Sequence, residues 1–553
     1  GATVSLQELA ELVYGEFTAQ SAWAAYALLK EGRYFTGDAA ALTGRDAAAV
    51  EADEGRRKLK QQDRAGRDAF LDRLRSGALD LPGDSRFLQD VEALACGRTD
   101  RSRTMRDLGR QETPVEAHRL LLSAGVWTPW VNPHPPRFGL SLAPPRFPLE
   151  PPPADESRLD LTRLAAYAID SPWSHDPDDA VSLEGNTLYV HVADPAAVLF
   201  PDSPADLEAR GRGTTLYIPE GSYRMIAEGA LPLYALGLSP VSPALTFKMT
   251  LNEDCSIADT DIFPSLVKVT RLSYGEADAL AREAGQENGA ASLLARLCAL
   301  ADRNRKRRLD GGGVLIDFPE VHITVTDEAV EVEALEAYRS GDMVRECMLL
   351  AGEGAARWAL QRRLPFPYVS QEPGDFPNSP LPGMAGAYQL RRCMRPRTLS
   401  VKPGPHAGLG LEVYTQVTSP LRRYTDLLAH QQIRAFLGRG QPAPPLGEDD
   451  LFLRLSAAEA AAQANTHAER ASRAFWTTVY LSDKKGAVWE GITLEKRGSR
   501  ALFLIPALGM ETQAPVKEEV ELNGPALLTL KSVRIPEGEA NFTLSSIKSE
   551  ERT

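Results

Sequence analysis

Cysteine is scarce in this sequence, and the few cysteines lie far apart. The 553 residues contain five cysteines and no CxxC pair. An odd, scattered set of cysteines is typical of free thiols in a reducing compartment. A zinc site or a disulfide framework is therefore not expected at the cysteine positions, which are Cys96, Cys255, Cys298, Cys347 and Cys393.

Long apolar segments are also missing. The sequence has no uninterrupted apolar run of about 18 or more residues, the length that a membrane-spanning helix needs. It also has no basic segment followed by an apolar one, which is the pattern of an export leader. We therefore expect a cytoplasmic protein without membrane contact.

Positive charge is in deficit. The chain carries 62 Lys and Arg against 75 Asp and Glu, which gives a formal net charge of -13. This balance excludes a protein that is coated with positive charge. It does not exclude a nucleic-acid partner, because a local basic channel is sufficient for binding.

The most informative feature that is present is a concentration of carboxylates. Four aspartates fall within ten residues, and they are Asp170, Asp176, Asp178 and Asp179. Carboxylates held a few ångströms apart repel one another strongly unless cations, shifted protonation or wide separation relieves the repulsion. We expect bound cations at this aspartate loop.

The type of ligand indicates which cation to expect. Oxygen ligands without a nearby cysteine or histidine pair suit a hard ion, and Mg²⁺ typically takes one or two carboxylates, several waters and phosphate oxygens. Mg²⁺, with Mn²⁺ as a substitute, is the expected cofactor, and phosphate chemistry is the expected reaction. A solvated acidic loop remains the structural alternative. A calcium-binding EF-hand does not fit, because the segment lacks the turn glycine and has Pro177 within the acidic run.

The aspartate loop is expected to be rigid and to connect two strands. Pro172 and Pro177 exclude a helix at this point. The apolar runs at 167–169 and 180–183 predict a strand on each side. One backbone excursion would then present all the carboxylates.

The length of the chain predicts several domains. About three to four are expected, because 553 residues are too many for one core. The first sixty residues begin with a capping box at Ser5–Glu8 and predict either a helix-turn-helix or winged-helix-like module or generic helical packing. We expect a multidomain α+β protein with a helical module at 1–60, a helical segment and proline-rich connector at 61–157, a mixed α/β catalytic candidate at 158–482, and a C-terminal β-barrel of the OB-fold, S-one type at 483–553.

Several motifs give residues 158–482 a resemblance to a known family. They lie at Ile169–Ser182 (the aspartate loop), His191–Asp194, Arg212–Pro219, Arg308–Phe318, Thr418–His430 and Ala468–Arg470. On these motifs the sequence resembles the ribonuclease II family, also called the RNB family, of 3′-to-5′ exoribonucleases. The resemblance implies an RNB catalytic domain over this region.

The resemblance also implies roles for individual residues. Arg422 matches the arginine that grips the phosphate near the scissile bond. Tyr217 and Phe318 match surfaces on which bases near the 3′ end stack, and Glu469 matches a glutamate near the terminal nucleotide that influences product release. The catalytic residues implied are Asp178, Arg422 and Glu469. The RNA-binding residues implied are Tyr217, Phe318, Arg422 and Glu469. The metal ligands implied are Asp170, Asp176, Asp178 and Asp179.

Some of these residues have a structural interpretation as well. Aromatic side chains such as Tyr217 and Phe318 are often core residues. The basic run Arg303–Arg308 either lines an RNA path or forms a favourable partner for a helix dipole while facing water. Both interpretations remain open from the sequence alone.

The sequence departs from the family pattern in three places. Residues 346–353 read ECMLLAGE where the family has an Ala-Asn pair, and Val369, Ser370 and Gln371 replace a common Arg and His. The pair of N-terminal cold-shock barrels typical of bacterial ribonuclease II is not evident, since the helical segment and connector occupy its place. RNA loading is therefore expected to differ.

The resemblance implies a Mg²⁺-dependent, sequence-independent 3′-to-5′ exoribonuclease. It would hydrolyse single-stranded RNA to nucleoside 5′-monophosphates by a two-metal-ion mechanism. We expect a monomer with single-stranded RNA as its partner and no obligate protein partner. The alternatives are a catalytically silent RNA-binding regulator and a metal-dependent endoribonuclease.

Overall fold

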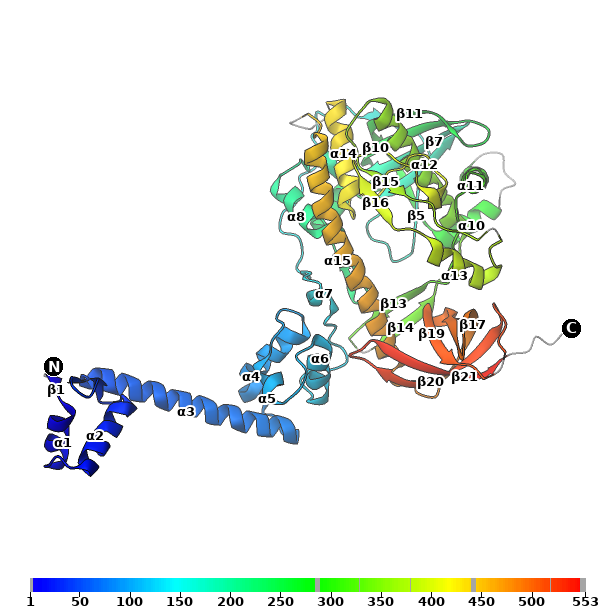
Figure 1. The fold of residues 1–553 in the computed structure, drawn as a ribbon. Coiled ribbons are helices and arrows are strands. Elements are labelled where there is room, and N and C mark those ends of the chain that lie inside the picture. The colour runs from blue at the N-terminus through cyan, green and yellow to red at the C-terminus, as the bar shows by residue number, and fades with distance from the viewer. Residues whose placement is uncertain are drawn as a thin grey trace. The chain divides into compact units, whose positions relative to one another are not determined.

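The chain forms two compact units with separate hydrophobic cores. The structure is a computed structural model and describes residues 3–283, 289–327, 329–377, 379–438, 444–517 and 519–547. One unit comprises Gly1–Ala95 and Thr99–Thr128, and the other comprises Cys96–Arg98 and Pro129–Thr553. Figure 1 follows the order of their helices and strands along the chain.

The first unit begins with two helices and a small antiparallel sheet. Ser5 caps the first helix with the expected capping box to Glu8, and Thr18 caps the second. The three strands lie in the order β1-β3-β2. This arrangement fits the winged-helix-like module that the sequence predicts. The elements are β1 (Thr3–Val4), α1 (Leu6–Tyr14), α2 (Ala19–Glu31), β2 (Phe35–Gly37) and β3 (Leu42–Gly44).

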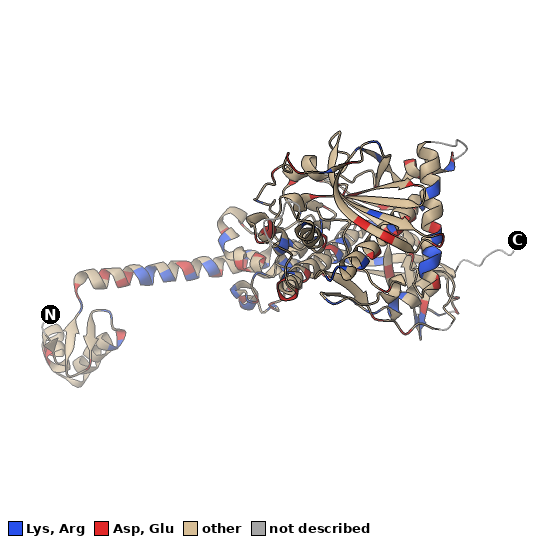
Figure 2. Cartoon of the chain, turned by 90° about the horizontal axis from the view of Figure 1, so that it is seen from above, with Lys and Arg blue, Asp and Glu red and all other residues tan. Residues whose placement is uncertain are grey.

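A helix of 30 residues, α3 (Ala47–Ser76), follows. Acidic and basic residues are interspersed along α3 (Figure 2), and its middle is exposed to solvent. Phe70, Leu71 and Leu74 near its C-terminal end are buried in a helical core with α4 (Leu81–Ala95), α5 (Arg103–Asp107) and α6 (Pro114–Ser123). The domain boundary expected at residue 60 falls inside α3, because charged helix-forming residues continue through it without a proline.

A sheet of seven strands organises the second unit, in the order β12-β5-β6-β7-β10-β11-β4. The edge pairs β5/β12 and β4/β11 are parallel, and the inner pairs are antiparallel. The strands predicted on both sides of the aspartate loop are confirmed. The bounds are β4 (Leu159–Asp160), β5 (Ala166–Asp170), β6 (Asp179–Glu184), β7 (Thr187–Ala193), β10 (Ser242–Leu251), β11 (Ile257–Val267) and β12 (Val269–Ser273).

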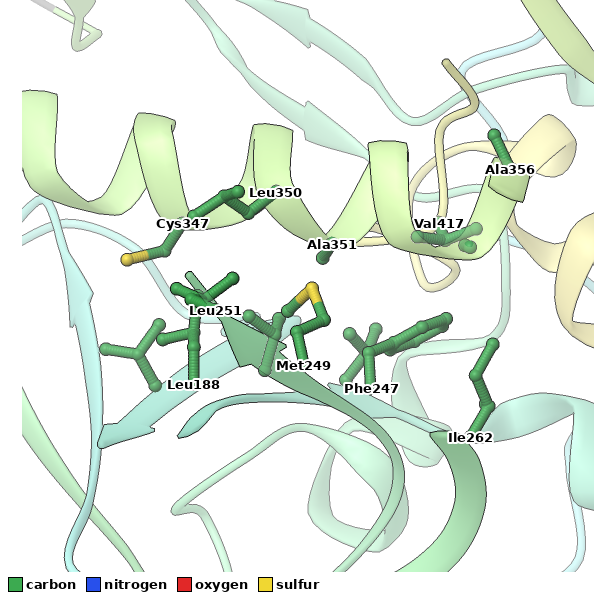
Figure 3. Packing of buried hydrophobic residues seen from close by; sticks show 14 of the residues in the cluster. Leu188, Phe247, Met249, Leu251, Ile262, Cys347, Leu350, Ala351, Ala356 and Val417 are labelled. Atoms are coloured by element: carbon green, nitrogen blue, oxygen red, sulfur yellow. The ribbon is translucent and has the colours of Figure 1, made fainter. Parts of the chain in front are cut away.

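Helix α12 (Arg339–Gln361) packs against this sheet through an apolar stripe. Figure 3 shows Phe247 and Met249 of β10 beneath Ala351 of the helix. Small residues let other segments approach α12 closely: a Cβ atom on Gly352 would lie 2.3 Å from the ring of Tyr414. The helix therefore fixes the sheet and the segment before the Arg422 motif together.

Further helices complete the second unit. Helices α8, α9, α14 and α15 share a second core with buried Tyr234, Tyr424 and Leu455. The bounds are α7 (His134–Arg137), α8 (Pro204–Arg212), α9 (Leu231–Tyr234), α10 (Tyr274–Arg282), α11 (Ala290–Asp310), α13 (Gly383–Cys393), α14 (Tyr424–Leu437) and α15 (Glu448–Leu481). Three hairpins accompany them: β8 (Leu216–Ile218) with β9 (Gly221–Tyr223), β13 (Val321–Val325) with β14 (Val330–Ala334), and β15 (Tyr368–Gln371) with β16 (Arg397–Ser400).

The C-terminal region is a nearly closed antiparallel barrel of five strands, consistent with the predicted OB fold. The strand order is β19-β18-β17-β20-β21. The bounds are β17 (Val488–Arg497), β18 (Arg500–Ile505), β19 (Met510–Pro515), β20 (Pro525–Arg534) and β21 (Glu539–Ile547). In the described ranges of the chain, no helix combines the length and apolar character needed to cross a membrane.

Truncating Phe247 tests the core beneath α12. Phe247 is fully buried, so Phe247→Ala should lower the free energy of unfolding by about 3–5 kcal/mol. Phe452→Ala is the matched control, because Phe452 is 53% exposed and its loss should change stability by less than about 0.5 kcal/mol. Urea denaturation of both variants measures the difference. If both variants lost the same free energy of unfolding, Phe247 would not stabilise the core beneath α12.

Candidate active site

The sheet fixes both ends of the aspartate loop. Asp170 is the last residue of β5, and Asp179 is the first residue of β6. The amide of Ala193 donates to the carbonyl of Asp178 over 2.7 Å, and the amide of Leu236 donates to Pro177 over 2.9 Å. The loop is therefore rigid at the point where its carboxylates begin and end.

Asp178 is buried and fully engaged. Its side chain accepts hydrogen bonds from the amide of Leu421 over 2.8 Å and from Nε of Arg422 over 2.9 Å. Burial raises the pKa of Asp178 to about 7 in spite of these partners. Asp178 therefore orients Arg422 rather than standing free for another ligand.

Asp176 is engaged on the other side of the loop. Its carboxylate accepts from the hydroxyl of Tyr217 over 3.1 Å and pairs with Nη1 of Arg224 over 2.5 Å. Arg224 supplies a positive charge that partly balances the four carboxylates. Sequence reasoning missed Arg224, because no motif connects it with the loop.

Asp170 and Asp179 keep free carboxylates. Within the described ranges, neither side chain forms a hydrogen bond or an ion pair. Burial and the neighbouring charge of Asp170 raise the pKa of Asp179 to about 7. Burial also raises the pKa of Asp170, and Asp176 adds to the effect. The charge of Arg422 offsets part of this rise at both carboxylates, but neither carboxylate forms an ion pair with it.

Arg422 lies in a turn that the following helix holds in shape. Asp426, in the first turn of α14, accepts from the amide of Ser419 over 2.8 Å and from Arg423 over 2.7 Å. The Arg422 side chain is 41% exposed, and no described residue accepts from its two Nη groups. Burial alone would lower the pKa of Arg422, but Asp178, Tyr217 and Asp179 outweigh burial and raise it. The guanidinium is charged and its outer edge is open.

Helix α15 positions Tyr217 through two residues one helical turn apart. Asn465 donates to the carbonyls of Arg212 and Thr214 over 3.0 and 2.9 Å. Glu469, whose pKa burial raises, accepts from the amide of Tyr217 over 2.9 Å. The Tyr217 side chain remains 44% exposed. The spacing of Asn465 and Glu469 on one helix face is a signal that could have identified Asn465 beside the predicted Glu469.

Gly213 allows this close approach. Its backbone has φ of +69°, and a Cβ atom there would lie 2.7 Å from the carbonyl oxygen of Ala458 on α15. Any side chain at this position would push the Tyr217 segment away from the helix.

Phe318 has packing partners that none of the other predicted site residues shares. The guanidinium of Arg391 sits 4.6 Å from the centre of its ring, and the ring packs against a cluster that contains Tyr388 and Leu494. Among the described residues, no ring contact joins Phe318 to Tyr217. The structure thus brings together the aspartates, Arg422, Tyr217 and Glu469. Phe318 packs next to the C-terminal barrel and lines a cavity together with Ser171 and Trp173 of the aspartate loop.

Several arginines of the basic run Arg303–Arg308 form ion pairs within the fold. Arg308 is buried and pairs with Glu346, and Arg307 pairs with Glu353. Arg305 pairs with Asp302 and Asp342. These ion pairs connect α11 to α12, so most of the run has a structural role.

The donor set fits a hard divalent cation. In the described part of the chain, no three or more Asp, Glu, His or Cys side chains form a complete metal cage. Asp170 and Asp179 nevertheless offer two oxygen ligands in a region of unbalanced negative charge. Mg²⁺ commonly takes only one or two protein carboxylates and completes its shell with water and phosphate oxygens.

Comparison with known proteins places this geometry in a family. The RNB domain matches residues 158–378 and 384–439, and a double HTH domain matches residues 50–133. The chain is 32% identical to an "Uncharacterized ribonuclease" of Synechocystis sp. over 92% of this chain and 81% of that protein. It is 28% identical to "Ribonuclease II, chloroplastic/mitochondrial" of Arabidopsis thaliana, over 80% of this chain but only 61% of the relative.

A solved structure shares the fold over nearly the whole chain. The Dss1 exoribonuclease of Candida glabrata superposes with a TM-score of 0.72 over 95% of this chain and 76% of that chain, at 17% sequence identity. The RNB match covers the seven-stranded sheet, the aspartate loop and the Arg422 turn, as the sequence motifs predict. The chain therefore belongs to the RNB family of ribonucleases.

Proposed function

We propose that this protein is a divalent-cation-dependent 3′-to-5′ exoribonuclease that hydrolyses single-stranded RNA to nucleoside 5′-monophosphates. One observation carries the proposal. Two carboxylates without hydrogen bonds, Asp170 and Asp179, lie within electrostatic reach of Arg422, whose two Nη groups are open. Together they provide places for a cation and for a phosphate within one loop and one turn.

The proposed metal ligands are Asp170 and Asp179, with Mg²⁺ as the cation and Mn²⁺ as a substitute. A bound divalent cation supplies positive charge that shields the phosphate and makes an attacking water more acidic. Asp178 and Asp176 belong to the same cluster, but their hydrogen bonds are used to orient Arg422 and Tyr217. We assign them a positioning role.

Arg422 is the proposed phosphate ligand. Asp178 holds Nε, so the two Nη groups remain to donate to phosphate oxygens near the scissile bond. A lysine at this position would lack the planar set of donors that allows one end to bind Asp178 and the other to bind phosphate.

Tyr217 is the proposed stacking surface for a base at the 3′ end. Its ring is exposed, while Glu469 fixes its backbone and Asp176 fixes its hydroxyl. Stacking uses the π face that every base has, which supports degradation without sequence preference. A silent RNA-binding regulator is the weaker proposal, since it would not need two part-buried carboxylates that form no hydrogen bond or ion pair within the described ranges.

A cleavage assay tests the proposed function. With 5′-labelled single-stranded RNA and Mg²⁺, we expect nucleoside 5′-monophosphates and a short 5′ end product, and EDTA should abolish both. Asp179→Asn and Arg422→Lys should each lower kcat by about 10²–10³-fold, because each removes charge stabilisation in the transition state. The control is Asp375→Asn, a carboxylate whose side chain is 92% exposed. Internal fragments would indicate an endonuclease, and intact RNA that still binds would indicate a regulator.

The stability of the metal-free protein gives an independent prediction. Asp179→Asn removes a charge that burial and Asp170 disfavour, so its melting temperature in EDTA should exceed that of the wild type. Added Mg²⁺ should stabilise the wild type more than the variant, because only the wild type keeps both carboxylates. Thermal unfolding with and without Mg²⁺ measures both effects. An equal response to Mg²⁺ would argue against Asp179 as a ligand.

The link between Glu469 and Tyr217 predicts an effect on RNA affinity. Glu469→Ala should raise the Kd for RNA by about two- to tenfold in an Asp179→Asn background, the range expected for one lost hydrogen bond. Glu469→Gln keeps an oxygen acceptor for the amide of Tyr217 and should remain within about twofold of the parent. Fluorescence anisotropy with labelled RNA measures Kd. A loss as large for Gln as for Ala would show that the charge of Glu469, not its contact with Tyr217, is what matters.

A further inference from the structure

Trp173 is an aromatic residue within the aspartate loop itself. It lies between Asp170 and Asp176, and its side chain is 44% exposed. Its ring stacks on His322 of β13, with ring centres 4.3 Å apart and planes inclined by 19°. The stack connects the loop to the β13–β14 hairpin and holds the indole in a fixed orientation.

Trp173 lines a large cavity beside the loop. The cavity has a volume of about 1400 Å³, and its walls include Ser171, Trp173, Tyr274 and Tyr338. Among the described residues that line it, Trp173 is present and His322 is not. His322 therefore backs the indole ring, and the cavity side of the ring is open to a ligand.

The cavity adjoins the proposed metal site. Ser171 directly follows Asp170 in the chain. Burial raises the pKa of Tyr274 to about 12, and the carboxylates of Asp170 and Asp179 contribute to the shift. A group bound between Trp173 and Tyr274 would thus lie next to the carboxylates that we propose hold the cation.

The charge of the cavity wall favours a neutral ligand group over a phosphate. Asp302 and Asp342 are paired with arginines of the same wall. Four other carboxylates of the wall form no ion pair within the described ranges, and they are Asp317, Glu320, Glu333 and Glu336. Negative charge repels a phosphate, whereas an uncharged aromatic ring gains contact with the exposed indole.

We propose that Trp173, backed by His322, is a stacking platform for the base of a nucleotide next to the cleaved bond. This inference rests on the proposed function. It gives the loop that holds the cation a second task, which is to hold RNA. Phe318, the second stacking surface expected from the sequence, lines the same cavity and has Arg391 over its ring, so Trp173 would add a platform within the aspartate loop itself. The platform accepts any base, because stacking does not distinguish base edges.

Abasic substitutions test the platform directly. Kd is measured with the full chain carrying Asp179→Asn and with single-stranded RNAs that have one abasic site at successive positions from the 3′ end. Trp173→Ala should raise Kd for intact RNA roughly 5- to 100-fold, as expected for one lost stacked base. Trp173→Phe, which keeps an aromatic ring, should stay within about threefold of the parent. An abasic site at one position should weaken binding by the parent protein and have no further effect on Trp173→Ala.

The contact between His322 and Trp173 allows a second test in the same binding experiment. His322→Ala should raise Kd for intact RNA less than Trp173→Ala does. The abasic position whose effect it reduces should be the same one. Trp23→Ala is the matched control, because Trp23 is 70% exposed and lies in the first unit. Abasic sites whose effects are the same in the parent and in Trp173→Ala would overturn the platform. The platform would also be overturned if Trp173→Ala bound RNA with unchanged Kd in the Asp179→Asn background and, in the chain that keeps Asp179, only needed more Mg²⁺ for activity, since Trp173 would then merely support the loop.

Cleavage by the wild type separates this inference from the proposed function. If the wild type neither binds nor cleaves RNA, the proposed function fails. If the wild type cleaves RNA and Trp173→Ala binds it with unchanged Kd, only the role of Trp173 fails. Thermal unfolding of Trp173→Ala and Trp173→Phe confirms that each variant is folded before binding is compared.

Discussion

The burial of like charges in one short loop is the constraint on which the site depends. Asp178 and Asp179 have pKa values raised to about 7, chiefly because burial disfavours their charged forms. The sheet and the loop's backbone hydrogen bonds prevent these carboxylates from moving apart. Arg422 and Arg224 balance only part of the charge. The remaining imbalance is what makes the loop a favourable place for a divalent cation.

Two distant segments of the chain meet at this loop, and each is held by contacts that also serve the site. The turn at Arg422 is shaped by Asp426 and bonded to Asp178. The segment that carries Tyr217 is fixed to α15 by Asn465 and Glu469 and to the loop by Asp176. The proposed phosphate ligand Arg422 and the proposed stacking residue Tyr217 are therefore each hydrogen-bonded to a carboxylate of the loop, Asp178 and Asp176 respectively. Such preorganisation lets the charges act on a substrate without first rearranging.

The sequence allowed much of this arrangement to be predicted, because its strongest signals are local. The prolines and apolar runs around the aspartates predicted a loop between two strands, which β5 and β6 confirm. The capping box at Ser5 predicted the start of α1. Arg224 and the division of the aspartates into engaged and free pairs were not predictable, since they depend on approach between segments far apart in the sequence. The aromatic at Phe318 was assigned from its motif, but its packing partners Arg391 and Leu494 come from α13 and the barrel. A motif carries no information about such contacts.

The most direct test of the account is to locate the cation. Crystals of the Arg422→Ala variant, which keeps all four aspartates but not the proposed phosphate ligand, can be soaked with Mn²⁺ and a single-stranded RNA and examined by anomalous scattering. The account predicts anomalous density within coordination distance of the carboxylates of Asp170 and Asp179, about 2.0–2.2 Å for a cation of this size. Density bound to Asp176 and Asp178 alone, or no density at the loop, would contradict it.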